Sequence, residues 1–208
     1  KIPAKVAASE LAARSSAPEY AASARPAFLE SDGLTATQRG TALHTFMQFA
    51  DYQAASVSPE GEVQRLVEQG FLTKEQGEAV DLERVKRFFA GDLAQRMLAA
   101  PRLLREYRFT VEIPAKDIDA TLPPELQEEP VVLQGAVDCA FEENGGLIVV
   151  DYKTDRVADP DKLRQRYAAQ VDLYAAALTR CTGLPVHGCY LYSFYQNQAL
   201  PVTVGQPG

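Results

Sequence analysis

Little in this sequence could cross-link the chain, anchor it in a membrane or power it with ATP. The three cysteines, Cys139, Cys181 and Cys189, form no C-x-x-C pair, which argues against a disulfide framework and against a zinc or iron–sulfur clip. No apolar run reaches the ~18 residues of a membrane-spanning helix. There is also no G-x-x-x-x-G-K-[ST] phosphate-binding loop. We therefore expect a soluble chain in a reducing compartment, with any ATP-driven work done elsewhere.

The sequence does contain enough chain and enough apolar residues for one folded core. Of its 208 residues, 46% are hydrophobic and 24% are charged, as in an average globular domain. The net charge of −7 argues against a general nucleic-acid binder, which is normally basic. The charge is unevenly spread, because residues 81–108 hold seven Lys or Arg against four acids, whereas residues 112–143 hold one Lys against nine. The chain begins with Lys1 and shows no signal-peptide core, so we expect a fragment of a larger polypeptide.

The hydrophobic pattern changes from helical to strand-like halfway along the chain. Residues 1–34, rich in Ala, Ser and Pro, are expected to form a loosely structured lead-in with one short helix. Residues 35–208 predict a single α/β domain, in which a mixed central sheet is flanked by helices and the N-terminal part is helical. Helices are predicted from Thr35, over Gly61–Gln69, Lys74–Ala90 and Asp92–Ala99, and from Asp159 to about Arg180. Strands are predicted at Leu104–Ile113, Val131–Phe141, Leu147–Tyr152, Val186–Tyr195 and Ala199–Val204, with a surface excursion at Pro114–Pro130.

A tight turn between two of these strands fixes which residues face each other. Asn144-Gly145 favours a two-residue hairpin loop, in which the numbers of paired residues add up to 289. Asp138 and Asp151 satisfy this condition, so their carboxylates are predicted to lie opposite each other across the ladder. Lys153 points to the same face as Asp151, because side chains alternate along a strand. The hairpin therefore predicts two acids and a lysine in one cluster.

Like charges on facing strands need compensation, and the residues leave more than one form of it open. Either one carboxyl has a raised pKa or a bound cation lies between the two, and a divalent ion is the simpler answer. A plainer alternative is a diagonal ion pair between Asp138 and Lys153, with Asp151 a solvated acid at the strand end. The joint pattern favours a site for an oxygen-ligated divalent metal, with a lysine that polarises a phosphate or a water.

At this point the sequence resembles the PD-(D/E)XK nucleases, in which an Asp and then Asp/Glu-x-Lys lie on adjacent strands of a restriction-endonuclease-like core. More narrowly, it is similar to RecB-type nuclease domains, and among them to the C-terminal nuclease domain of AddA helicase-nuclease subunits. The segments that carry this resemblance are Arg39-Gly40-Thr41-Ala42-Leu43-His44, Gly135-Ala136-Val137-Asp138, Asp151-Tyr152-Lys153-Thr154-Asp155 and Gln170-Val171-Asp172-Leu173-Tyr174.

The resemblance implies a role for each matched residue. It implies that His44, Asp138, Asp151 and the backbone carbonyl of Tyr152 bind Mg²⁺, for which Mn²⁺ could substitute. It makes Asp138, Asp151 and Lys153 the catalytic residues, with Lys153 orienting the attacking water and stabilising charge on the phosphate. Some members of the family carry a four-cysteine iron–sulfur cluster, but these three cysteines lack its spacing, so no cluster is expected.

Four residues have structural alternatives at this stage. His44 on its own would more often be a histidine satisfied by hydrogen bonds on a helix flank. Gln170 and Tyr174, four residues apart, could be a core tyrosine with its hydrogen-bonded glutamine, whereas the resemblance makes them shape the active site and contact DNA. For Glu106, a surface ion pair is favoured over a role near the metal.

The resulting hypothesis is a Mg²⁺-dependent exonuclease that hydrolyses single-stranded DNA delivered by a helicase. The resemblance implies double-strand break processing and recombinational repair in a bacterial cytoplasm, associated with the nucleoid. Its partners would be single-stranded DNA, a helicase domain of the same full-length chain and a second helicase-nuclease subunit, with no membrane. A catalytically silent DNA-binding or scaffold domain, and a metal phosphoesterase acting on small nucleotides, remain as alternatives.

Overall fold

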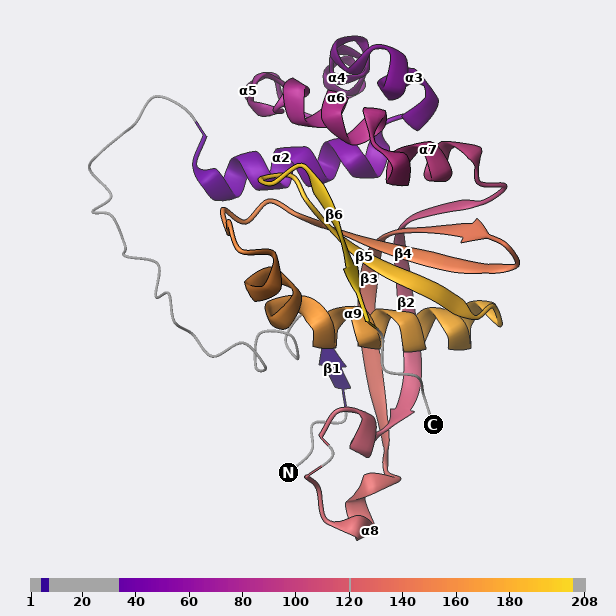
Figure 1. Cartoon of the computed structure of the whole chain (residues 1–208). Coiled ribbons are helices and arrows are strands. Elements are labelled where there is room, and N and C mark those ends of the chain that lie inside the picture. Colours follow the sequence, from indigo (N-terminus) through magenta and orange to yellow (C-terminus); the bar gives the residue numbers. More distant parts are fainter. Residues whose placement is uncertain (1–4, 8–33, 120, 204–208) are drawn as a thin grey trace, which may run out of the picture.

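The computed structural model describes residues 5–7, 34–119 and 121–203 of the chain (Figure 1). Within them, six strands form one mixed sheet with helices on both faces, which confirms the predicted fold class. The strands are β1 (Lys5–Ala7), β2 (Leu103–Pro114), β3 (Pro130–Glu143), β4 (Gly146–Lys153), β5 (Val186–Ser193) and β6 (Gln198–Val202). The α-helices are α2 (Ala36–Phe49), α3 (Tyr52–Val57), α4 (Pro59–Glu68), α5 (Lys74–Ala79), α6 (Leu82–Ala90), α7 (Asp92–Ala99), α8 (Pro124–Gln127) and α9 (Pro160–Thr182).

Most of the predicted lead-in, including the short helix expected there, lies outside the described residues. The exception is Lys5–Ala7, which forms β1 and pairs with β3 in parallel. The sequence did not predict this strand, because three residues are too few to show an alternating pattern. The division of the chain at residue 35 stays a prediction.

The helical front half differs from its prediction at two points. The single helix predicted over Lys74–Ala90 is wrong, because Val80 is extended and Asp81 begins a second helix by accepting a hydrogen bond from the Arg84 amide (3.2 Å). The short helix α3 was not predicted at all; it is capped by Asp51 and ends just before Ser58-Pro59.

The long strand β3 organises the sheet. Strand β2 pairs with it antiparallel from Pro114–Pro130 to Leu103–Phe141. The other edge of β3 is shared, because β1 pairs with residues 132–134 and β4 pairs with residues 139–143. Between these two stretches lies Asp138, just beyond the end of the β3–β4 ladder. The ladder register, Cys139 with Val150 and Glu143 with Gly146, confirms the predicted pairing sum of 289.

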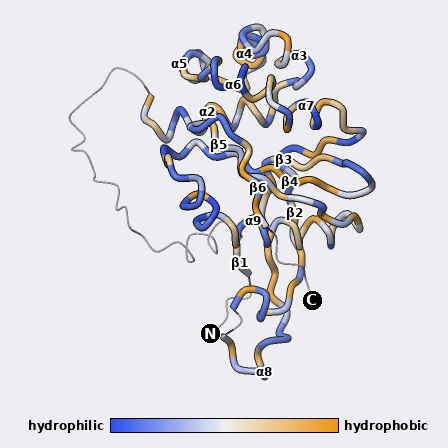
Figure 2. The backbone as a smooth tube through the Cα atoms, viewed as in Figure 1, coloured by the Kyte–Doolittle hydropathy of each residue, from blue (hydrophilic) through white to orange (hydrophobic). Residues whose placement is uncertain are grey.

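Helices cover the two faces of the sheet with two separate cores (Figure 1). Along β4, Ile148, Val150 and Tyr152 pack with the helices α2, α3, α4, α6 and α7, whereas Leu147 and Val149 pack with α9. Hydrophobic residues accordingly run through the central strands (Figure 2). Because side chains alternate, the polar end of β4 has its acid and its lysine on the α9 side and its tyrosine on the other.

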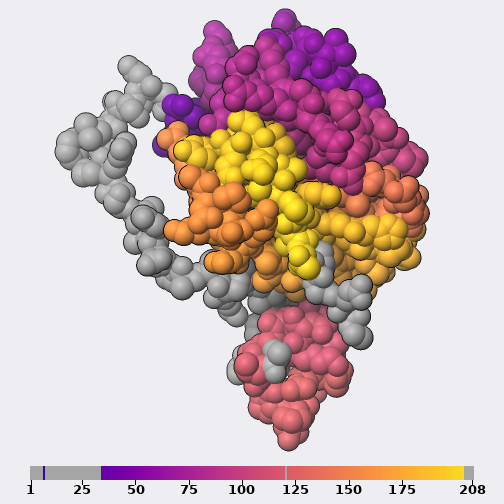
Figure 3. Space-filling view, in the orientation of Figure 1, coloured from indigo at the N-terminus to yellow at the C-terminus, as the bar shows by residue number. Residues whose placement is uncertain are grey.

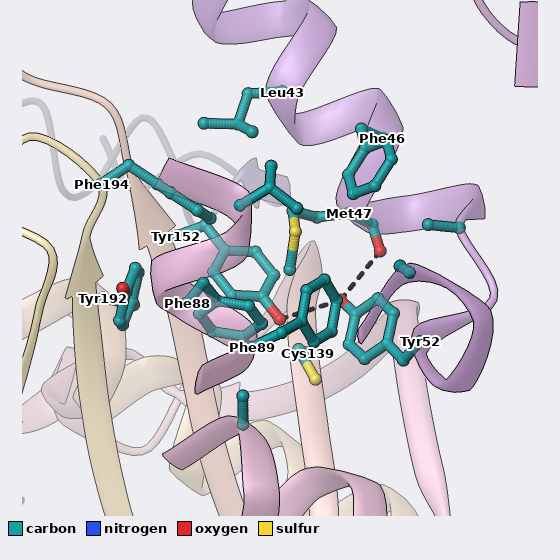
Figure 4. Packing of buried hydrophobic residues seen from close by; sticks show 14 of the residues in the cluster. Leu43, Phe46, Met47, Tyr52, Phe88, Phe89, Cys139, Tyr152, Tyr192 and Phe194 are labelled. Carbon is teal, nitrogen blue, oxygen red and sulfur yellow. Dashed lines mark hydrogen bonds between the residues drawn. The ribbon is translucent and has the colours of Figure 1, made fainter. Parts of the chain in front are cut away.

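An aromatic cluster joins the helical layer to the end of β4 (Figure 4). The ring of Phe88, which is fully buried, lies at centroid distances of 4.7 to 6.5 Å from the rings of Tyr52, Phe89, Tyr152, Tyr192 and Phe194. The Tyr52 hydroxyl donates to the Met47 carbonyl at 2.9 Å and shares a second 2.9 Å hydrogen bond with the Tyr152 hydroxyl. This chain of hydrogen bonds ties the C-terminal end of α2 to the middle of the Asp151-Tyr152-Lys153 motif.

The segment between β2 and β3 projects from the body as a separate lobe, as predicted for a surface excursion (Figure 3). It contains a 3-10 turn at Ala115–Asp117 and the short helix α8. Elsewhere, none of the described helices combines the length and the apolar character that crossing a membrane requires.

Removing the central ring should show how strongly the aromatic cluster holds the two layers together. Phe88→Ala is expected to lower the free energy of unfolding by about 3–5 kcal/mol, through lost burial and the cavity left behind. The matched control is Val57→Ala on the exposed surface of α3, which should change it by less than about 0.5 kcal/mol. Urea unfolding followed by circular dichroism measures both, and equal losses in the two variants would contradict this account of the core.

Candidate active site

The end of β4 holds a buried ion pair. Asp151 is 2% exposed, and its Oδ2 lies 2.6 Å from Nζ of Lys153, two residues further along the strand. Burial lowers the pKa of Lys153, but the charge of Asp151 outweighs it and raises that pKa above its usual value. The predicted shared face of these two residues is confirmed. The alternative that pairs Lys153 with Asp138 and leaves Asp151 in solvent is wrong.

Helix α9 encloses the Lys153 ammonium from the other side. Nζ lies 3.2 Å from Oε1 of Gln170 and 3.7 Å from the centre of the Tyr167 ring, a cation–π contact. Gln170 in turn donates from Nε2 to the Tyr174 hydroxyl at 2.7 Å. The structure therefore brings Gln170 into contact with the predicted catalytic lysine, with Tyr174 behind it.

Tyr167 was not singled out by the sequence, although it lies one helical turn before Gln170 on the same face of α9. Its ring covers the Lys153 ammonium, and its hydroxyl donates to Oδ2 of Asp155 at 3.0 Å. Asp155 also pairs with Arg166, at 3.3 Å. Tyr167 thus connects the lysine of the motif with the acid at the end of the same motif.

Asp138 occupies a break in the regular pattern of β2 and β3. On one side of it, Val137 packs in the core under α9, whereas Cys139, which would share its face in a regular strand, packs in the opposite core. The partner strand changes faces at the same position, because Leu103 and Tyr107 also belong to opposite cores although the pairing register is unchanged. Both strands therefore switch their facing at one pair of positions, 106 and 138.

The backbone of Glu106 shows the strain of this switch. Its φ is +46°, in the left-handed region that residues other than glycine seldom adopt, and its register places it opposite Asp138. The surface ion pair favoured for Glu106 is not what the structure shows, since no ion pair to it occurs among the described residues. Glu106 instead lines the same cleft as Asp138. A β2–β3 register would have placed Glu106 opposite Asp138 from the sequence alone. No short turn joins these two strands, however, so the sequence could not give that register.

The Asp138 carboxylate is held next to the motif on β4. Its Oδ2 accepts a hydrogen bond from the backbone amide of Tyr152 at 2.9 Å. Burial, and then the negative charge of Asp151, raise the pKa of Asp138 to about 7. A raised pKa on one acid, the first form of compensation considered for this pair, is therefore present alongside the neutralising charge of Lys153.

His44 approaches the acids from α2. A capping box starts this helix, with Thr35 Oγ1 accepting from the Gln38 amide at 3.2 Å. Nδ1 of His44 lies 3.7 Å from Oδ2 of Asp138, and its side chain is 40% exposed. Partial burial lowers its pKa, with a smaller opposing effect from Asp151, so the imidazole is neutral and free to bind a metal at neutral pH.

A glycine lets α2 come this close. A Cβ atom on Gly40 would lie 2.8 Å from Oγ1 of Thr154, which directly follows β4. This close approach explains the glycine in the Arg39–His44 segment, and His44 lies one turn further along the helix, at Asp138.

His44 and Asp138 open onto a cleft of about 240 Å³, whose lining does not include Asp151 or Lys153. Its lining includes the acids Glu106 and Asp138, His44, and the polar residues Thr41, Thr45 and Gln48. Tyr152 lines the cleft as well, and its ring points into the aromatic cluster (Figure 4).

The donors suit a divalent cation by kind, but they are not drawn together as in a closed metal site. Two carboxylates and a neutral imidazole are ligands that Mg²⁺ or Mn²⁺ accepts. Within the described part of the chain, however, no three His, Cys, Asp or Glu side chains already converge closely enough to hold a metal. In this structure the two acids are offset in another way. Lys153 pairs with Asp151, and Asp138 has a raised pKa.

Paired acids and an adjacent lysine at the end of a mixed sheet form a site suited to cleaving phosphodiesters. Residues 17–200 match the PD-(D/E)XK nuclease superfamily, and the chain belongs to this superfamily. The resemblance predicted from the four motifs is thereby confirmed.

Several curated relatives share one description, that of a subunit of an ATP-dependent helicase/nuclease. The protein of Acetivibrio thermocellus is 38% identical over 215 residues, which cover 96% of this chain and 17% of the relative. That of Thermoanaerobacter pseudethanolicus is 36% identical over 84% of this chain and 15% of its own length. That of Clostridium botulinum strain Hall is 37% identical over 82% and 14%. The chain thus spans only 14% to 17% of the length of these relatives.

The raised pKa of Asp138 predicts an unusual dependence of stability on pH. Between about pH 4 and pH 7 the Asp138 carboxyl holds more of its proton in the folded state than in the unfolded state, so its contribution to stability should fall as the pH rises through this range. Asp138→Asn removes this loss and keeps an acceptor for the Tyr152 amide. In EDTA, its free energy of unfolding should exceed that of the wild type at pH 8 by on the order of 1–4 kcal/mol, with a much smaller difference at pH 4.

Urea unfolding at the two pH values measures this difference. A gap of equal size at both would contradict a raised pKa at Asp138, because a simple change in packing does not depend on pH in this way.

Proposed function

We propose that this chain is the nuclease part of a helicase-nuclease enzyme and that it hydrolyses single-stranded DNA in a reaction that requires Mg²⁺. The family supports a nuclease, and the relatives support DNA as its substrate. The proposal includes exonuclease cleavage of a strand that a helicase domain delivers, and a second helicase-nuclease partner chain. It also includes a role in double-strand break repair in the bacterial cytoplasm.

The observation that carries it is the buried Asp151–Lys153 pair beside Asp138. Holding two carboxylates together inside a protein is costly, and a purely structural or scaffolding domain would gain nothing from it. Replacing such a group by an apolar one is commonly neutral or stabilising. The strained backbone of Glu106 adds to that cost at the same place. Strain and repulsion concentrated in one open cleft are typical of a catalytic site.

The residues that would hold Mg²⁺ are Asp138, Asp151 and His44, with the carbonyl of Tyr152. We add Glu106 as a candidate ligand, because it lines the cleft opposite Asp138. When bound, the ion supplies Lewis-acid stabilisation of the phosphate and a more acidic water. Lys153 orients the attacking water and stabilises the negative charge that develops on the phosphate. His44 binds as a neutral ligand, and Gln170 keeps Lys153 in place.

Conservative substitutions at the ion pair test the reaction. Asp151→Asn and Lys153→Met should each lower Mg²⁺-dependent cleavage of labelled single-stranded DNA by at least about 10²–10³-fold, because each removes charge stabilisation in the transition state. Lys162→Met, on the exposed surface of α9, is the matched control and should cleave like the wild type. EDTA should abolish cleavage by all of the variants.

Folding must be separated from chemistry in this experiment, because each single variant leaves a buried charge without its partner. The double variant Asp151→Asn/Lys153→Met keeps the site neutral and should fold with the circular dichroism spectrum of the wild type, yet not cleave. If the wild type binds DNA but cleaves none with Mg²⁺ or Mn²⁺, the silent scaffold is supported instead. Faster cleavage of nucleotides than of DNA would support the small-nucleotide phosphoesterase.

The Tyr167 ring gives a finer test of how Lys153 is held. Tyr167→Leu removes the cation–π contact and should lower kcat by about tenfold with little change in KM, because the ammonium loses its position rather than its charge. Tyr167→Phe keeps the ring and should restore most of kcat, although it loses the hydrogen bond to Asp155. Steady-state cleavage of single-stranded DNA measures both constants, and a Phe variant as slow as the Leu variant would assign the effect to Asp155 instead.

A further inference from the structure

A second hollow adjoins the acidic cleft. It is a groove of about 630 Å³ bounded by the start of α2, the start of α6 and the segment that follows β4. Thr41 and His44 of α2 line both hollows, so the groove and the cleft adjoin each other at these two residues. Figure 3 shows the start of α2, the segment after β4 and the β5–β6 turn together at one corner of the molecule.

The two hollows differ in charge. Among the described residues, the cleft is lined by two acids, Glu106 and Asp138, and by no lysine or arginine. The groove is lined by three arginines, Arg39, Arg84 and Arg156. A line that passes from one hollow to the other therefore runs from a positive surface to the acids of the active site.

The acids in the groove do not cancel its arginines. Asp155 is already paired with Arg166 and accepts from the Tyr167 hydroxyl, and Asp81 pairs with Arg84 at 3.0 Å. Arg39 is exposed, and its side chain donates to the neutral Leu34 carbonyl at 3.0 Å. Arg156 is also exposed, and the described residues offer it no ion pair. Two full positive charges therefore remain for a ligand.

An aromatic ring stands at the rim. The guanidinium of Arg84 lies 5.7 Å from the ring centre of Tyr195, which is 38% exposed in the turn after β5. A positive groove edged by an exposed ring suits a single nucleic-acid strand, because arginines contact its phosphates and a base stacks on the ring whatever its sequence.

We propose that this groove binds the backbone of the DNA strand on one side of the bond to be cut, with Arg39 and Arg156 contacting phosphates. The inference rests on the proposed nuclease function and assigns the substrate a direction across the site. Phosphates beyond the scissile bond meet only the acidic cleft, so the strand is held on the groove side alone. After cleavage, the piece in the groove stays bound and the piece beyond the cleft leaves.

The binding half of this proposal is tested without cleavage, in the Asp151→Asn/Lys153→Met background, by fluorescence anisotropy with labelled oligo(dT). Adding Arg39→Ala and Arg156→Ala together should raise Kd by about tenfold. It should also lower the slope of log K against log salt by about 1.4, since each phosphate contact on a single strand contributes about 0.7. The matched control is Arg102→Ala, an exposed arginine just before β2 that lies outside the groove, and it should leave both values unchanged.

The directional half is tested with wild-type protein on oligonucleotides that carry one neutral methylphosphonate at successive positions. Substitutions on one side of the cleaved bond should lower kcat/KM several-fold, and those on the other side should have little effect. Equal losses of kcat/KM for substitutions on both sides of the bond would overturn the proposal that the groove binds the strand. A salt slope that Arg39→Ala/Arg156→Ala does not change would overturn it as well. Wild-type protein that binds oligo(dT) through these arginines but cleaves no DNA would overturn the nuclease function and leave the groove as a DNA-binding site.

Discussion

The structure of the site depends on one unfavourable interaction, the repulsion between Asp138 and Asp151. A buried carboxylate next to a second, partly buried one is tolerated only if charge or protonation offsets them. Here the offset has two parts: Lys153 lies 2.6 Å from one acid, and the pKa of the other is raised to about 7. Each part needs support of its own, from Gln170 and Tyr167 on α9 for the lysine and from the Tyr152 amide for Asp138.

This requirement explains why distant segments are packed so closely around the end of β4. The aromatic cluster around Phe88 holds α2 against the sheet through the hydroxyls of Tyr52 and Tyr152, and Gly40 lets the same helix approach Thr154. On the opposite face, the 23 residues of α9 form a single long helix, so Tyr167, Gln170 and Tyr174 share one rigid face. The core thus positions the charged groups from both sides of the sheet.

The charge distribution separates two tasks that the overall net charge of −7 conceals. Acids gather at the cleft and in the projecting lobe, whereas uncompensated arginines lie in the adjoining groove. A strand of DNA carries its own negative charge, so a favourable path has to begin on the positive side. The site can then keep the acids that a metal needs without repelling the substrate along its whole length.

The sequence by itself determined what depends on short range. The Asn144-Gly145 turn set the β3–β4 register, which ends at Cys139 and Val150, next to Asp138 and Asp151, because a two-residue turn leaves no freedom in the pairing. Alternation placed Lys153 beside Asp151, and Asp159-Pro160 marked the start of α9. Motif resemblance singled out His44.

Only the tertiary structure decided what depends on packing between distant segments. The face switch at Glu106 and Asp138, the Tyr167 ring over Lys153 and the arginine groove each join residues far apart in the chain. No local pattern records such contacts, because they are selected by how the layers fit together and not by the preferences of neighbouring residues.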